Sequence, residues 1–134
     1  MDDKSTDDLA GEAGKLLSLF KYLLDQLKTH TTPRGTTLLD EGVAVYVNDL
    51  ATGAHSYDNV PYLLAGRAGG FLKTGLYVDA GDVPNNVFTT NNKILNTIGA
   101  AVGCKNAAGD PLDDFGDPTL EKGMIDAIVK AGQM

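Results

Sequence analysis

VAVYV, residues 43–47, is the stretch that decides the fold class of this sequence. It is continuously apolar and rich in β-branched residues, a pattern typical of a strand buried on both faces, as in a parallel sheet. A second short apolar run, PYLLA at residues 61–65, follows the polar, turn-prone residues 48–59. FLKTGLYVD at 71–79 adds one or two short strands around Gly75. We therefore expect short strands joined by polar loops.

Helical periodicity lies on both sides of these strands. Apolar residues recur at steps of three and four between residues 9 and 29, which predicts an amphipathic helix there. The same pattern predicts a helix at about 92–102 and another at 120–131. Helix, strand, strand and helix in this order predict an α/β fold with a short, mostly parallel sheet flanked by helices. The predicted core consists of the apolar residues of these elements: Leu16, Phe20, Leu23, Leu24, Val43, Val45, Val47, Leu63, Leu64, Ile94, Leu95 and Ile98.

Length and charge narrow the class of protein. We expect a single α/β domain over residues 1–134, with the polar residues 1–8 as a disordered lead-in. Eleven basic and eighteen acidic residues give a formal net charge of −7, which argues against a nucleic-acid partner. No apolar run reaches the roughly 20 residues that span a bilayer, and the N-terminus has no signal-peptide pattern. The single cysteine, Cys104, excludes an internal disulfide and we interpret it as a bystander thiol.

The loop that joins the first two strands is the best candidate for a site. Asp49, His55 and Asp58 carry side chains that can bind a metal, and His55 could also act as a general base. Open α/β sheets place their ligand sites at the carboxyl ends of parallel strands, where this loop would lie. The alternative is a solvated turn, in which Asp and Asn side chains bond the loop's own backbone.

A glycine-rich loop, GRAGG at residues 66–70, follows the second strand. It lacks both the P-loop ending and the dinucleotide glycine spacing, so we interpret it as a tight turn where the backbone passes close to another element. Arg67 and Lys73 could place positive charge beside the His55 loop, or be solvated. We interpret His30 as a cation at the end of the first helix.

Several blocks of the sequence together resemble a known family. They are FKYLLDQLK, GTTLLDEGVAVYVNDL, HSYDNVPYLLAGRAGGFLKTG, NNKILNTIGAAVG and FGDP. Across roughly residues 15–118 the chain resembles the C-terminal part of a bacterial family of largely uncharacterised proteins named for an HxxSHH motif, which is similar to the alkaline phosphatase and sulfatase superfamily. The resemblance implies the C-terminal portion of an alkaline-phosphatase-like fold.

The resemblance also implies roles for residues of the loop. His55 stands where the superfamily has a metal-binding histidine ahead of a Val-Pro strand, here Val60-Pro61. Asn48 and Asp49 stand where it has an acidic residue and a histidine at a strand end, so the pair reads Asn-Asp here instead of Asp-His. The implied cofactor is a divalent metal such as Zn²⁺ or Ca²⁺. The remaining candidate residues of the site loop are Ser56, Asn59, Arg67 and Lys73.

Three functions remain open from the sequence. In the first, the chain is the C-terminal segment of a phosphatase- or sulfatase-like protein, inactive alone, and completes a metal site with an N-terminal half that supplies the nucleophile and the other ligands. In the second, it is a binding or assembly subunit of a larger complex without a metal site. In the third, it is a small enzyme that uses His55 with Asp49 or Asp58. Family members carry an export signal that this sequence does not show, so localisation stays open.

Overall fold

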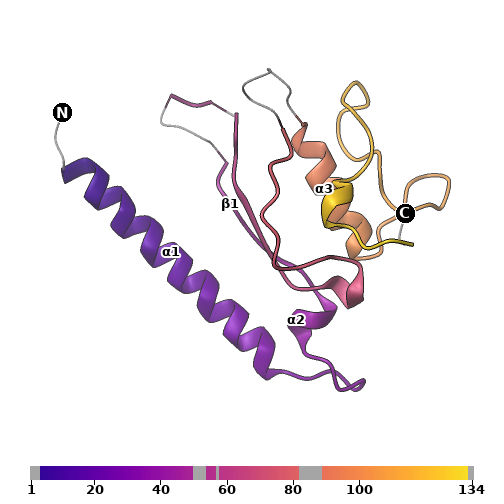
Figure 1. Cartoon of the computed structure of the whole chain (residues 1–134), viewed down its shortest axis with the longest axis horizontal. Coiled ribbons are helices and arrows are strands. Elements are labelled where there is room, and N and C mark those ends of the chain that lie inside the picture. Colours follow the sequence, from indigo (N-terminus) through magenta and orange to yellow (C-terminus); the bar gives the residue numbers. More distant parts are fainter. Residues whose placement is uncertain (1–3, 50–53, 57, 82–88, 133–134) are drawn as a thin grey trace. The chain divides into compact units, whose positions relative to one another are not determined.

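The computed structural model describes residues 4–49, 54–56, 58–81 and 89–132. The chain forms two compact units, one ending at Leu38 and one beginning at Leu39 (Figure 1). The described elements combine helices with a small sheet, so the fold is mixed α/β. They are α1 (Lys4–Thr29), α2 (Leu38–Glu41), β1 (Ala44–Val47), β2 (Tyr62–Ala65), the 3₁₀ turn η1 (Ala68–Gly70), α3 (Asn91–Ala101) and the 3₁₀ turn η3 (Asp126–Ile128).

The first unit is mainly the long helix α1. It confirms the helix predicted at residues 9–29 and begins earlier, so residues 4–8, predicted as a lead-in, belong to the helix. Two ion pairs, Lys15–Glu12 at 2.6 Å and Lys21–Asp25 at 2.5 Å, join exposed side chains about one turn apart. Each stabilises the helix by about 0.3 kcal/mol. Among the described residues, no helix combines the length and the apolar content needed to cross a membrane.

The sheet of the second unit has two strands, and they are antiparallel. The strand positions at residues 43–47 and 61–65 are confirmed, but the predicted parallel pairing is wrong. Ala44 pairs with Ala65, and Val47 pairs with Tyr62. A parallel pair needs a crossover connection, usually a helix, whereas antiparallel neighbours such as β1 and β2 do not. The prediction that the run 43–47 is buried on both faces is also wrong, because Val45 and Val47 are exposed.

Two other predicted elements are absent from the described structure. Residues 71–79 form no strand beyond one isolated bridge between Leu72 and Val129, and the helix predicted at 120–131 is reduced to η3. The reason lies in the backbone hydrogen bonds of the C-terminal segment. Lys73 N donates to Ile128 O at 2.8 Å and Lys130 N donates to Phe71 O at 3.0 Å, so the segment pairs with residues 71–73 instead of with itself.

The core of the described structure is small and differs from the predicted one. None of the twelve predicted core residues is fully buried, and Val45 and Leu63 are 36% and 46% exposed. Helix α3, predicted from its Ile and Leu residues, instead buries polar Asn96 and Thr97 against the C-terminal loops. The buried residues are Ala44, Ala68, Leu72, Asn96, Thr97, Ala100 and Val129.

Candidate functional site

Residues 48–61 join β1 to β2 and contain most of the predicted site residues. Asn48 and Asp49 follow β1 directly and are exposed. His55, Asp58 and Asn59 are exposed as well, and Ser56 is half-buried. Five of these six polar residues are therefore exposed to solvent, as both interpretations of the sequence predict.

Two described residues of this loop have turn conformations. His55 and Asn59 adopt left-handed conformations, with φ of 61° and 57°, which few residues other than glycine do. Between them, Ser56 Oγ donates to Asp58 Oδ2 at 3.0 Å and accepts a hydrogen bond from Asp58 N at 3.1 Å. The structure thus brings Ser56 and Asp58 together, and their contact stabilises the turn itself.

The proposed metal ligands of this loop do not form a cluster. Among residues 4–49, 54–56, 58–81 and 89–132 there is no group of three or more His, Cys, Asp or Glu side chains that could hold a metal ion. Asp49, His55 and Asp58 all belong to this described part. Since a bound Zn²⁺ takes four ligands and a Ca²⁺ six or more, these residues alone do not fit a metal centre. The metal site remains a prediction that depends on further ligands.

Arg67 and Lys73 lie away from the His55 loop. Strand β2 runs from the loop towards Arg67, which immediately precedes η1 and has an exposed side chain. Lys73 extends its ammonium to Ala127 O at 3.1 Å and so holds the C-terminal segment. Neither cation is placed to support chemistry at His55.

A groove of about 860 Å³ lies along β2, and the sequence analysis did not find it. Its walls come from β2, residues 72–81, the start of α3 and two isoleucines near η3. Several separated segments build it, so no local pattern in the sequence could have revealed it. Desolvation raises the pKa of the Tyr62 phenol, which lines this groove. The volume is in the range of ligand sites.

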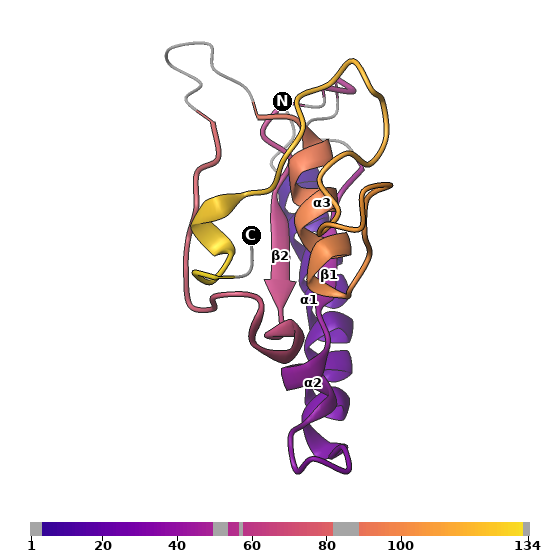
Figure 2. The same cartoon turned by 90° about the vertical axis from the view of Figure 1, so that its right-hand side faces the viewer.

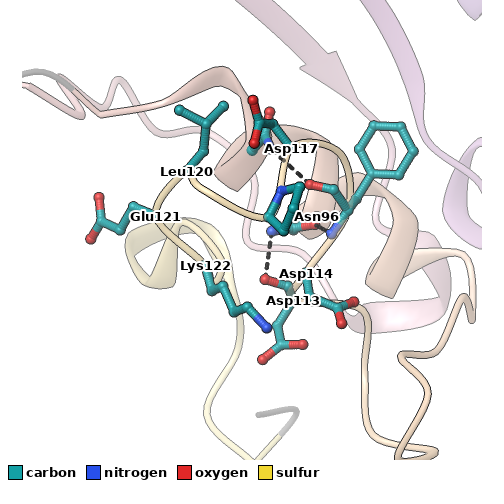
Figure 3. Close-up of a pocket in the computed structure, with 10 residues that line it drawn as sticks. Asn96, Asp113, Asp114, Asp117, Leu120, Glu121 and Lys122 are labelled. Carbon is teal, nitrogen blue, oxygen red and sulfur yellow. Dashed lines mark hydrogen bonds between the residues drawn. The ribbon is translucent and has the colours of Figure 1, made fainter.

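A second, much smaller pocket of about 10 Å³ lies beside Asn96 (Figure 3). It has room for about one water molecule, and acidic side chains such as Asp113 and Asp117 surround it. Hydrogen bonds from the Thr119 side chain and backbone lower the pKa of Asp117. Asn96 Nδ2 donates to Asp113 O and its Oδ1 accepts from Phe115 N, as dashed lines in Figure 3 show, and Nδ2 also donates to Gly123 O. This pocket is therefore a structural junction between α3 and the loops.

His30 and Cys104, which the sequence analysis also considered, lie outside the loop of residues 48–61. The carbonyl of His30, directly after α1, accepts a hydrogen bond from Leu38 N at 2.9 Å. Cys104 is an exposed free thiol. Comparisons with protein-family models, with curated proteins and with solved structures found no match to this chain. Conclusions about function therefore rest on the sequence motifs and the geometry.

Proposed function

We propose that this chain is a non-catalytic assembly segment whose sheet is completed by β-strands of a partner polypeptide. The docking surface is the outer edge of β1, which is the edge that faces away from β2. The motif resemblance suggests that the partner is the N-terminal half of a phosphatase- or sulfatase-like protein. One observation carries the proposal. The described residues form a sheet of only two strands, so each strand has one edge without a hydrogen-bonded neighbour.

An isolated two-stranded sheet is marginally stable in water, and its unpaired edges are templates for further pairing. Both faces of this sheet also expose apolar side chains. Because the register sets Tyr46 opposite Leu63 and Val47 opposite Tyr62, Leu63 and Val47 lie on opposite faces. They are 46% and 42% exposed. A sheet whose two faces and two edges are all incompletely covered is what we expect of a segment that folds against additional chain.

Hydrogen exchange of the isolated, monomeric chain tests this proposal. We expect the amides of Ala44–Val47 to exchange roughly 100-fold faster than those of α3, because few contacts oppose local opening of the sheet. Adding the separately expressed N-terminal half of an HxxSHH-family protein should slow exchange in β1 by a similar factor.

Each of two matched variants replaces an exposed aliphatic residue with lysine. Val47→Lys should abolish the protection in β1, whereas Leu95→Lys, at a similarly exposed residue of α3, should leave it intact. Strong protection of β1 in the monomer without any partner would overturn the proposal, since the sheet would then be stable by itself.

The alternative is an assembly subunit without a metal site. The observation in its favour is that the described residues contain no cluster of three metal-binding side chains. In the split-protein version, Asp49, His55 and Asp58 would complete a metal centre only together with ligands from the partner. In the alternative, the loop serves as a turn.

Calorimetric titration with Zn²⁺ and Ca²⁺ distinguishes the two versions. For the isolated chain we expect no binding tighter than about 1 mM, because too few donors converge. In the complex with the N-terminal half, the split-protein version predicts binding that weakens at least about tenfold in His55→Ala, since histidine is a direct ligand there. His30→Ala is the matched control. Equal metal binding by the wild-type complex and His55→Ala would exclude His55 as a ligand.

A further inference from the structure

The two walls of the groove of about 860 Å³ indicate what kind of ligand it can bind. One wall is the outer edge of β2, and the facing wall is the segment 72–81, which runs in the opposite direction to β2 (Figure 2). Both walls belong to the second unit of the chain. The groove lies on the opposite edge of the sheet from the β1 surface, so an inference about it is independent of the proposed function.

The wall formed by β2 is suited to pair with a polypeptide backbone. The described residues supply no third strand, so the N–H and C=O groups on the outer edge of β2 face the groove without a ladder partner. Backbone groups withdrawn from water need hydrogen-bond partners, and an added strand satisfies several of them at the correct spacing. A compact small molecule does not reproduce that alternating row of donors and acceptors.

The opposite wall is anchored before any ligand binds. Lys73 N donates to Ile128 O at 2.8 Å, and Lys73 Nζ donates to Ala127 O at 3.1 Å. Leu72, 3% exposed, forms a bridge with Val129 at the base of this wall. Binding would therefore not have to order the lower end of the wall, which reduces its entropic cost.

The side chains of the groove favour an apolar strand. Leu63 and Leu76, on facing walls, are 46% and 54% exposed, and Ile94 contributes from α3. Near the start of α3, Thr90 Oγ1 is buried without a hydrogen-bond partner among the described residues, and Thr90 lines the same groove. Such an unsatisfied hydroxyl is unusual in a finished core.

The charges at one end of the groove indicate what flanks the apolar strand. Asp58 and Asp79 line the groove, and the antiparallel course of its walls brings residues 58–60 and 79–81 to the same end (Figures 1 and 2). The Asp58 carboxylate accepts from Ser56, and that of Asp79 accepts from Gly81 N. Within the described part of the chain neither carboxylate has a cationic partner. This end is therefore complementary to Lys or Arg.

We propose that the groove along the outer edge of β2 binds an extended, apolar peptide segment of a partner protein that carries Lys or Arg at the end beside Asp58 and Asp79. The peptide adds a third strand to the sheet, and its backbone pairs with β2. Its alternate side chains contact Leu63 and Leu76. The basic residue at its end neutralises the acidic end of the groove.

Fluorescence anisotropy with two labelled peptides tests the inference on the full chain. The probe is KVTVTVK, and its charge-reversed counterpart is EVTVTVE. We expect KVTVTVK to bind with a Kd on the order of 10 µM and EVTVTVE to bind at least about fivefold more weakly at low salt. The double variant Asp58→Asn with Asp79→Asn should remove that preference, because both carboxylates are then replaced by neutral amides.

Two wall variants locate the binding. Leu63→Lys and, on the facing wall, Leu76→Lys should each weaken binding of KVTVTVK at least about tenfold; both residues are exposed, so both variants should fold. Val102→Lys, at an exposed residue outside the groove, is the control. Equal affinity for the two peptides, no saturable binding up to about 1 mM, or unchanged affinity in both wall variants would overturn the inference. Self-association that Leu63→Lys abolishes, without peptide binding, would assign the groove to a second copy and overturn it as well.

Discussion

Gly66→Ala is expected to destabilise the second unit by about 4 kcal/mol, because the new methyl group would overlap backbone atoms. A Cβ at Gly66 would lie 2.3 Å from Gly42 O and 2.8 Å from Leu39 O. Neither oxygen can move freely, since Leu39 O accepts from Arg67 N at 3.3 Å and Gly42 O accepts from Ala68 N at 3.0 Å. These two bonds connect the end of β2 to the chain that precedes β1.

The backbone conformation at Gly66 adds to this cost. Its φ of +113° lies in a region that residues with a Cβ rarely adopt. Gly75→Ala is the matched control, because Gly75 also has a positive φ, of +75°, but a methyl group there would have no other atom within 4 Å. We expect the control to lose only about 1 kcal/mol from backbone strain.

Urea unfolding followed by tyrosine near-UV circular dichroism measures both variants, since the chain has five tyrosines and no tryptophan. Faster hydrogen exchange of the Arg67 and Ala68 amides reports the loss of stability at this contact. Equal destabilisation by the two substitutions would show that the close approach to residues 39–42 contributes nothing, and that positive φ alone accounts for the effect.

Sequence patterns located the strands but not their pairing. Residues 44–47 and 62–65 are strands because apolar, β-branched runs are a local signal. The direction of pairing depends on where the chain goes between them, and the polar residues 48–61 carry no periodicity that separates a wide turn from an irregular crossover. Continuous apolar runs were interpreted as fully buried, yet Val45 and Val47 are exposed. The assumption that failed is that a continuous apolar run is covered on both faces.

The core and the groove were missed for a different reason. The apolar stripe of α3 predicted the helix correctly. Two of its three buried residues, Asn96 and Thr97, are nevertheless polar, because the adjoining loops 104–125 have backbone groups that need partners. Such loops are recognised only once their path is known. The predicted loop residues Ser56 and Asp58 do meet, and a short-range turn of this kind is predictable from spacing. The groove depends on long-range packing and has no comparable signal.

Asn96→Ala is the second substitution with a large expected effect, roughly 3 kcal/mol of destabilisation. Asn96 is 1% exposed, and its side chain forms hydrogen bonds with three backbone groups of the loops. Its Nδ2 donates to Asp113 O at 2.8 Å and to Gly123 O at 2.9 Å, while its Oδ1 accepts from Phe115 N at 2.8 Å. Alanine would leave Gly123 O and Phe115 N without their partner, whereas Asp113 O would keep the hydrogen bond from Gly123 N at 2.8 Å. The loops would lose their side-chain attachment to α3 at this residue.

Asn92→Ala serves as the control for this substitution. Asn92 lies about one turn earlier on α3 and donates a single, exposed hydrogen bond to Phe115 O at 2.7 Å. Water can replace that bond, so we expect a loss of about 0.5–1 kcal/mol. Urea unfolding gives the difference between the two variants. A loss below about 1 kcal/mol in Asn96→Ala would mean that water enters and satisfies the loop, contrary to the structural role inferred for this residue.

Asn96→Asp separates the donor function of this side chain from its acceptor function and from its shape. The carboxylate would keep the hydrogen bond from Phe115 N but would face Asp113 O and Gly123 O without a proton to donate. At neutral pH we therefore expect destabilisation at least as large as in Asn96→Ala, since a buried charge is added. Burial and the two facing carbonyls disfavour the charged carboxylate, and protonation restores one donor. The penalty relative to the wild type should therefore shrink as the pH falls from neutral towards about 4, the usual pKa of an aspartate in the unfolded chain, and stay constant below it. A penalty independent of pH would show that the two carbonyls do not depend on Nδ2.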